Sequence, residues 1–153
     1  MKKPEMKVEP IKNGTVIDHI TANKSLHVLK ILGLPNNDIN LSIAMNVYSK
    51  RKKRKDVVKI ENRELDSSEL HQIALVAPKA TINIIRNYDV VSKEKVSFMK
   101  ELKSIIDCTN SNCISNTSEP IESRFELLKT SPILLRCYFC ERLIDAEEIN
   151  KQF

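Results

Sequence analysis

The chain has 153 residues, of which 41% are hydrophobic, so it can form one ordinary domain or two small ones with packed cores. Its two glycines exclude a glycine-rich phosphate loop, and no apolar run approaches the roughly 20 residues of a membrane span. The net charge of +5 is uneven, because residues 102–153 carry six Lys and Arg against eight Asp and Glu. An anionic partner is therefore expected on the N-terminal part.

The first hundred residues predict alternating strands and helices. Strands are expected at residues 14–20, 41–47, 55–61, 81–85 and 88–96, and helices at 24–32 and from Asp66 to Pro78. The first helix ends at Gly33 and Pro35, and the second begins with Asp66 and Glu69 in the spacing of a capping box.

The apolar pattern indicates which faces are buried. Leu41, Ile43, Met45 and Val47 alternate with polar or small residues, so the strand at 41–47 is expected to bury one face. Leu70, Ile73, Ala74 and Ala77 fall on one face of the second helix. The element order is β-α-β-β-α-β with one strand appended, which predicts a ferredoxin-like antiparallel sheet covered by two helices on one face. The other face is left for solvent, a ligand or a partner.

Four cysteines lie in the last third of the chain, as Cys108-x4-Cys113 and Cys137-x2-Cys140. Two short pairs separated by a longer loop are typical of a structural zinc site, in which four thiolates leave no position for a catalytic water. The alternatives are a rubredoxin-type iron centre, disulfides or inert thiols. The N-terminus lacks a hydrophobic signal core, so we expect a cytoplasmic protein, whose reducing compartment favours metal over disulfides.

These features divide the chain into an N-terminal domain, 1–97, and a small β-rich zinc domain, 98–153. The join at 97–103 is not a flexible Gly/Ser linker, so we expect the two domains to pack together. The zinc domain has few hydrophobic residues, and it is expected to need its metal in order to fold.

Two polar motifs in the N-terminal domain have alternative interpretations. The six consecutive cations from Lys50 to Lys55 could clamp phosphates, or the first four or five could form a solvated hairpin tip, the interpretation we favour. Asp18 and His19 are an acid–imidazole pair, but neighbouring residues of a regular strand point to opposite faces, so we do not expect the two side chains to lie together. No catalytic triad or hydrolase motif is visible, and we expect no enzymatic activity of the chain itself.

Along its whole length the chain resembles the regulatory chain of aspartate carbamoyltransferase. The most specific segments are Asn13-Gly14-Thr15-Val16-Ile17-Asp18-His19-Ile20 and Cys108-Thr109-Asn110-Ser111-Asn112-Cys113-Ile114-Ser115. Others are Val8-Glu9-Pro10-Ile11, residues 54–62, 75–83 and 87–91, Glu119-Pro120, and Cys137-Tyr138-Phe139-Cys140-Glu141. The resemblance implies a non-catalytic subunit in pyrimidine biosynthesis. Its N-terminal domain would dimerise and bind CTP and ATP, with UTP adding to inhibition by CTP, and its zinc domain would dock onto the catalytic chain and join catalytic trimers.

The resemblance also implies site residues. In the nucleotide site, the residues around the base would be Val8, Glu9, Pro10, Ile11 and Val16, and the walls of the base and sugar pocket would be Asn83, Ile85, Tyr88 and Val90. Asp18 would contact the ribose, Lys59 the sugar or the phosphates, and His19 and Lys93 the phosphates. Lys55 would lie near a second nucleotide or its metal. The residues facing the catalytic chain would be Asn110, Asn112, Glu141 and Arg142, beside one zinc ion per chain held by the four cysteines. Pro10 departs from the small non-proline residue common in the family and removes a backbone donor.

The basic run and the cysteine set also suggest a rival, a zinc-ribbon protein that binds nucleic acid. Such a protein would bind mixed-sequence RNA or DNA with a steep salt dependence. The acidic balance of residues 102–153 disfavours it, since ribbons that touch phosphates are usually basic. We therefore expect neither a nucleic acid nor a membrane among the partners.

Overall fold

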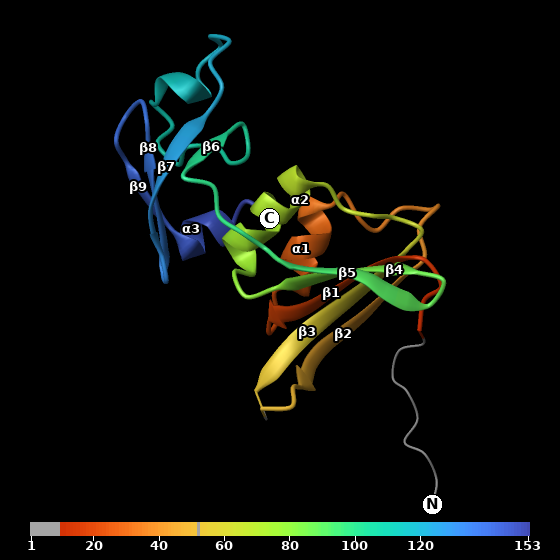
Figure 1. Cartoon of the computed structure of the whole chain (residues 1–153). Coiled ribbons are helices and arrows are strands. Elements are labelled where there is room, and N and C mark those ends of the chain that lie inside the picture. Colours follow the sequence, from red (N-terminus) through yellow and green to blue (C-terminus); the bar gives the residue numbers. More distant parts are fainter. Residues whose placement is uncertain (1–9, 52) are drawn as a thin grey trace, which may run out of the picture.

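The computed structural model describes residues 10–51 and 53–153, so Val8 and Glu9 of the predicted nucleotide site lie outside the described residues. The chain forms two antiparallel sheets, one in each half (Figure 1). The elements in order are β1 (Gly14–Thr21), α1 (Ser25–Ile31), β2 (Leu41–Tyr48), β3 (Arg54–Glu61), α2 (Ser67–Val76), β4 (Thr81–Arg86), β5 (Asp89–Lys95), β6 (Glu101–Lys103), the 3₁₀ turn η1 (Ile114–Asn116), β7 (Arg124–Thr130), β8 (Ile133–Cys137), β9 (Leu143–Asp145) and α3 (Ala146–Asn150).

The first sheet has the strand order β2-β3-β1-β4-β5, with every neighbouring pair antiparallel. Its first four strands have the order of a ferredoxin-like sheet, and β5 is added beside β4, as the sequence predicts. In Figure 1, α1 and α2 lie on the same side of this sheet. Ile17, Val58 and Ile82 of the central strands are buried beneath the helices, in one core with Val28 and Ile73.

The local signals in the sequence explain both helices. The N–H of Gly33, at φ +69°, donates to the carbonyl of Lys30, and the N–H of Leu34 donates to that of Leu29, which together form a Schellman motif at the end of α1. At the start of α2 the Asp66 carboxylate accepts from the N–H of Glu69, and the Glu69 carboxylate accepts from the N–H of Asp66, completing the predicted capping box.

The strand β2 differs from its prediction. Leu41 and Ile43 stand opposite Ile60 and Val58 of β3, but a bulge between Ala44 and Val47 breaks the alternation, so Val47 pairs with Lys55 instead. Ile43 and Met45 remain 37% and 40% exposed, so the expected buried face is wrong for this chain on its own. The reason is position: β2 is the edge strand of the sheet, where Leu41 still packs against the core but Ile43 and Met45 stay exposed.

The second sheet has the order β6-β7-β8-β9 and packs against α3. Its core centres on Phe125, Leu135 and Ile144 together with the buried cysteines. Leu75 of α2 also belongs to this core, and Phe98 of the join contacts both cores, as does Phe153. The two halves therefore pack together, as the composition of the join suggests. Among the described residues, no helix is long and apolar enough to cross a membrane.

Candidate functional site

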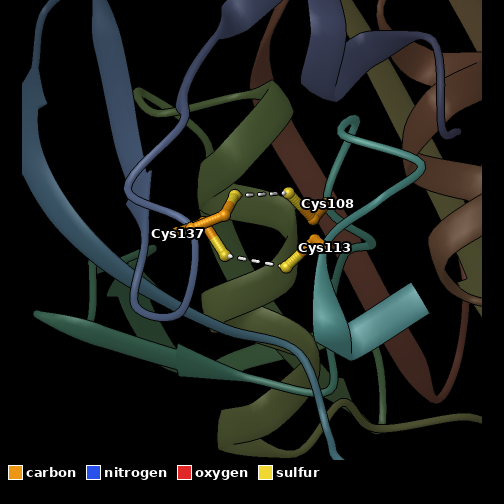
Figure 2. A group of neighbouring side chains, drawn as sticks. Cys108, Cys113 and Cys137 are labelled. Carbon is orange, nitrogen blue, oxygen red and sulfur yellow. Dashed lines mark hydrogen bonds between the residues drawn. The ribbon is translucent and has the colours of Figure 1, made fainter. Parts of the chain in front are cut away.

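The four cysteines converge from two loops of the second sheet. Cys108 and Cys113 lie in the loop between β6 and η1, while Cys137 ends β8 and Cys140 lies in the turn before β9. Their sulfur atoms all lie within 4.8 Å of one another, with 3.6 Å between Cys108 and Cys140 and 3.7 Å between Cys113 and Cys137. Figure 2 shows the two loops facing each other across this cluster. Backbone hydrogen bonds fix both turns, from the N–H of Cys113 to the carbonyl of Asn110 and from the N–H of Glu141 to that of Cys137.

The spacing of the sulfur atoms distinguishes a metal site from disulfide bonds. A disulfide requires about 2.0 Å between sulfurs, so these distances exclude bonded pairs. A tetrahedral zinc with bonds of about 2.3 Å separates its sulfurs by about 3.8 Å, close to both contacts observed. The four thiols thus fit one zinc ion, which would be structural because all four positions are filled by protein.

The thiols have unequal proton affinities. Burial raises the pKa of Cys108 to about 12, and its contacts with Cys140 and Cys137 add to the rise. Burial also tends to raise the pKa of Cys140, but the N–H of Arg142 and the side chain of Asn110 outweigh it and lower the pKa to about 7. A bound zinc ion would ionise all four thiols. Metal uptake at neutral pH is therefore expected to release protons.

The second candidate site is the uncovered face of the first sheet, here called the open face. Along each central strand, alternate residues are buried beneath the helices, and the residues between them point to the opposite, open face. Strand register aligns four of them in one row across β3, β1, β4 and β5, namely Lys59, Val16, Asn83 and Lys93. The family resemblance implied one site for all four, and the strand register places them side by side.

The open face changes in character along β4, from charged groups at the start of the strand to apolar groups at its end. On one side of the row, Ile85 stands opposite Gly14 and Val90, and the Tyr88 turn next to it is exposed. On the other side, Asp18 and Lys95 both stand opposite Thr81. Apolar groups thus gather where β4 ends, and charged groups, namely Lys95 and the Asp18–Lys55 ion pair, where β4 begins.

Asp18 and His19 lie together, contrary to our expectation from strand alternation. A bulge in β1 places both residues between Ile17, opposite Val58, and Ile20, opposite Asp56. His19 adopts φ 57°, and its Nδ1 atom lies 3.9 Å from Asp18 Oδ2 and 3.0 Å from Thr81 Oγ1. A bulge re-aims side chains in this way, and the residue pattern gave no sign of it.

Asp18 also forms an ion pair at the end of the open face where β4 begins, here called the corner of the open face. Lys55 Nζ lies 2.7 Å from Asp18 Oδ1. Burial tends to raise the pKa of Asp18, but Lys55 and the backbone N–H of His19 outweigh it, so the net pKa is lowered from 3.8. The carboxylate is therefore ionised at neutral pH, and any anion at this corner competes with it for Lys55.

The remaining predicted nucleotide residues lie at the edge of the open face. Ile11 is buried, Pro10 is exposed, and the N–H of Tyr88 donates to the carbonyl of Lys12, which ties the β4–β5 turn to the segment before β1. The basic run is divided by the structure. The Arg54 guanidinium stacks on the Tyr48 ring, with 4.3 Å between its Cζ atom and the ring centroid, and Lys55 pairs with Asp18. Lys50, Arg51 and Lys53 are exposed at the β2–β3 turn.

The four residues predicted to face a partner lie close to the metal ligands. Asn110, Asn112, Glu141 and Arg142 all belong to the two cysteine loops, and Arg142 Nε donates to Thr109 Oγ1 at 2.8 Å. The structure adds an apolar group that the sequence analysis missed: Tyr138, Phe139 and Leu143 are exposed on the Cys137–Cys140 turn and β9. Two consecutive aromatic residues between metal ligands were the available signal.

The fold and these sites define a class of protein. It is a binding protein in which an open sheet face, apolar at one end and charged at the other, is joined to a small metal-binding module. Two family models match the chain. "Aspartate carbamoyltransferase regulatory chain, allosteric domain" covers residues 6–97, and "Aspartate carbamoyltransferase regulatory chain, metal binding domain" covers residues 100–150.

Curated proteins of similar sequence match this chain across its whole length. A curated aspartate carbamoyltransferase regulatory chain from Methanothermobacter thermautotrophicus is 59% identical over 154 residues, covering 100% of this chain and 99% of the relative. One from Methanosphaera stadtmanae is 48% identical over 100% of both chains. This chain therefore belongs to the family of aspartate carbamoyltransferase regulatory chains. It is a non-catalytic regulatory subunit, its partner is the catalytic chain, and its four-cysteine cluster is consistent with a structural zinc.

Proposed function

We propose that the chain binds the nucleotides CTP and ATP, with UTP as a third effector, on the open face and so controls the attached catalytic chain. The observation that carries the proposal is the gradient of this face, from Ile85 and Val90 at one end to Lys95 and the Lys55–Asp18 ion pair at the other. A nucleotide has the same polarity, with a flat, largely apolar base at one end and phosphates at the other. Lysines bind phosphates as point charges.

The proposed arrangement follows the rows of the sheet. The base lies toward Ile11, Ile85, Tyr88 and Val90, with Val16 beneath it. The sugar lies over the central row, where Asn83 and Lys59 offer hydrogen bonds to hydroxyls, with Asp18 on the adjoining row. The phosphates lie toward Lys93 and His19. Lys55 serves a second nucleotide or its metal when it leaves Asp18.

The zinc module is proposed to join the catalytic trimers. Asn110, Asn112, Glu141 and Arg142 supply polar contacts, and the exposed pair Tyr138 and Phe139 supplies apolar area of the kind found at interface centres. The proposed domain boundary remains between residues 97 and 98, and the proposed compartment is the cytoplasm, where reduced cysteine pairs keep their metal.

A second copy of the chain is proposed to pair along β2. This strand is an open edge of the sheet and exposes Ile43 and Met45. An exposed apolar edge strand is a template for strand pairing with another chain, and here it would bring two regulatory chains together.

One experiment tests the proposal as a whole. The chain is mixed with the matching catalytic trimer, the assembly is measured by light scattering, and carbamoyltransferase activity is titrated with CTP, ATP and UTP. We expect a larger assembly and a nucleotide response that the trimer alone does not show. Assembly without any nucleotide response contradicts the effector site, and failure to assemble contradicts the docking role.

A further inference from the structure

A cavity lies where the two halves of the chain meet. Its volume is about 600 Å³, within the range of small-molecule sites, and it is bounded on one side by α2 and on the other by residues 99–105. Figure 1 shows the join running past α2 toward β6. None of the residues that line the cavity belongs to the predicted nucleotide site, to the cysteine loops or to the group predicted to face the catalytic chain.

One face of α2 forms the first wall of the cavity. Ser67 and His71 are four residues apart on the helix, as are Ser68 and Gln72, so the four side chains lie on one face. The buried residues of α2 lie on its other faces, because they pack into the cores of the two halves. The wall therefore consists of two hydroxyls, an amide and an imidazole, all of which can donate hydrogen bonds.

The second wall supplies a positive charge. Glu101 and Lys103 flank the buried Leu102 on β6, so both side chains point away from the core of the zinc module. The Glu101 carboxylate is engaged by Arg124 of β7. Lys103 is exposed and forms no ion pair with any residue of 10–51 or 53–153. The cavity thus has one cation whose charge is not offset, and it favours an anion.

The carboxylates at the start of α2 do not oppose an anion in the cavity. Asp66 and Glu69 do not line it. The Asp66 carboxylate accepts from the N–H of Glu69 in the capping box, and the Glu69 carboxylate pairs with Arg63 at 2.6 Å. The negative charge of Glu69 is therefore offset by a neighbouring guanidinium, and that of Asp66 interacts with the N-terminus of its own helix.

The cavity also has apolar lining. Met99 is 43% exposed, and Ile105 is half-buried against the core of the zinc module. Ser104 beside it adopts φ 57°, a conformation that costs energy for a residue other than glycine and is frequent at binding sites. Apolar side chains next to a cation and several donors indicate a ligand that has a short carbon skeleton as well as a negative charge.

We propose that this cavity binds a small organic oxyanion, with a carboxylate or phosphate group held by Lys103 and His71 and a short carbon chain lying against Met99 and Ile105. Such a ligand contacts both halves of the chain at once and stabilises their packed arrangement, because a ligand favours the state that contains its site. The site is separate from the proposed nucleotide site, since α2 covers the side of the first sheet opposite the open face.

The test follows the histidine ring signals of the full-length, zinc-loaded chain by NMR. The chain has three histidines, of which His71 lines the cavity, and His71→Gln assigns its signal. The probes are butyl phosphate, butyrate and uncharged butanol, titrated at fixed ionic strength because salt screens the charge of an exposed lysine. His27, which lies on α1 against Phe153, is the internal reference.

We expect at least one of the two anions to shift the His71 signal saturably while His27 stays unchanged, and the tighter of the two identifies the anionic group. Butanol is expected to have little effect. Lys103→Ala should weaken the anion about fivefold to tenfold, as for the loss of one charge-assisted contact. Lys129→Ala, which removes an exposed lysine of β7, is the matched control and should leave the affinity unchanged.

Three results overturn the proposal. The first is that neither anion shifts the His71 signal, and the second is that butanol shifts it as strongly as the anions do. The third is an equal loss of affinity in Lys103→Ala and Lys129→Ala, which would show a general effect of net charge and no contact with Lys103.

Discussion

Asp56 shows how one buried carboxylate organises the first half of the chain. Its side chain is fully buried, and it accepts from the N–H of Ser25 at the start of α1 and from the N–H of Asn46 in the β2 bulge. Asp56 therefore holds the start of α1 on one side of the sheet. Lys55, the residue before it on β3, pairs with Asp18 on the open face.

Replacing Asp56 by Asn is expected to destabilise the chain. The amide retains only one acceptor oxygen, so one buried N–H loses its partner, at a cost of about 1–3 kcal/mol. Urea unfolding measures the change, with Asp66→Asn as the control, because Asn is also a good N-cap for α2. Equal and small effects in both variants would contradict this role of Asp56.

The same group predicts a pH dependence. Burial tends to raise the pKa of Asp56, but the backbone N–H groups of Asn46 and Ser25 outweigh it and lower the pKa below 3.8. A depressed folded-state pKa stabilises the fold above the unfolded value and loses that contribution as the pH falls through the folded value. Wild type should therefore lose stability below about pH 4 more steeply than Asp56→Asn. Parallel curves for the two proteins would show that Asp56 is not responsible.

At the residue scale, the sequence predicts least well at the bulges of β1 and β2. The family resemblance implied a common site for Val16, Lys59, Asn83 and Lys93, and the register aligns them in one row, because these strands are regular there. Strand alternation failed for His19 and Asn46, which adopt φ 57°. A bulge adds a residue without changing the apolar pattern nearby, so neither the contact of His19 with Thr81 nor the pairing of Val47 with Lys55 could be anticipated.

At the scale of elements, the helices were the most predictable part. Their start and stop signals are local in sequence: the capping box of Asp66 and Glu69, and Gly33 at the end of α1. The edge position of β2 is not local. It depends on which strands pair, and an alternating apolar pattern is equally compatible with a face covered by helices and with one covered by a second chain.

The exposed edge strand predicts a defect in self-association. Met45→Lys places a charge on β2, and the self-association constant is expected to fall more than tenfold, because an unpaired charge would be buried in the interface. Light scattering over a range of protein concentrations measures it. Leu128→Lys is the control, since Leu128 is 39% exposed on β7 of the second sheet. Loss of association in both variants, or in neither, rules out pairing along β2.

At the scale of the whole molecule, the two halves are distinct sheets with a shared joint. Leu75 extends from α2 into the core of the zinc module, Phe98 and Phe153 contact both cores, and the main-chain oxygen of Phe153 lies 2.7 Å from His27 Nδ1 on α1. The composition of residues 97–103 suggested that the modules pack, but not which residues do so, because the partners lie far apart in sequence. The joint provides a physical connection between the proposed effector face and the metal module.

Removing the metal tests how far the halves depend on each other. Chelation, or Cys113→Ala, is expected to unfold the zinc module, since structural zinc contributes about 10–16 kcal/mol in small zinc-binding peptides and this core is small. Nucleotide binding should persist, because the open face shares no residue with the cysteine loops. The first sheet should nevertheless melt several degrees lower, since Leu75 and Phe98 lose their contacts with the zinc module. Circular dichroism and calorimetry follow both changes, with Ser118→Ala, in an exposed turn of the same module, as the control. A parallel loss of nucleotide affinity would show instead that the two halves fold as one unit.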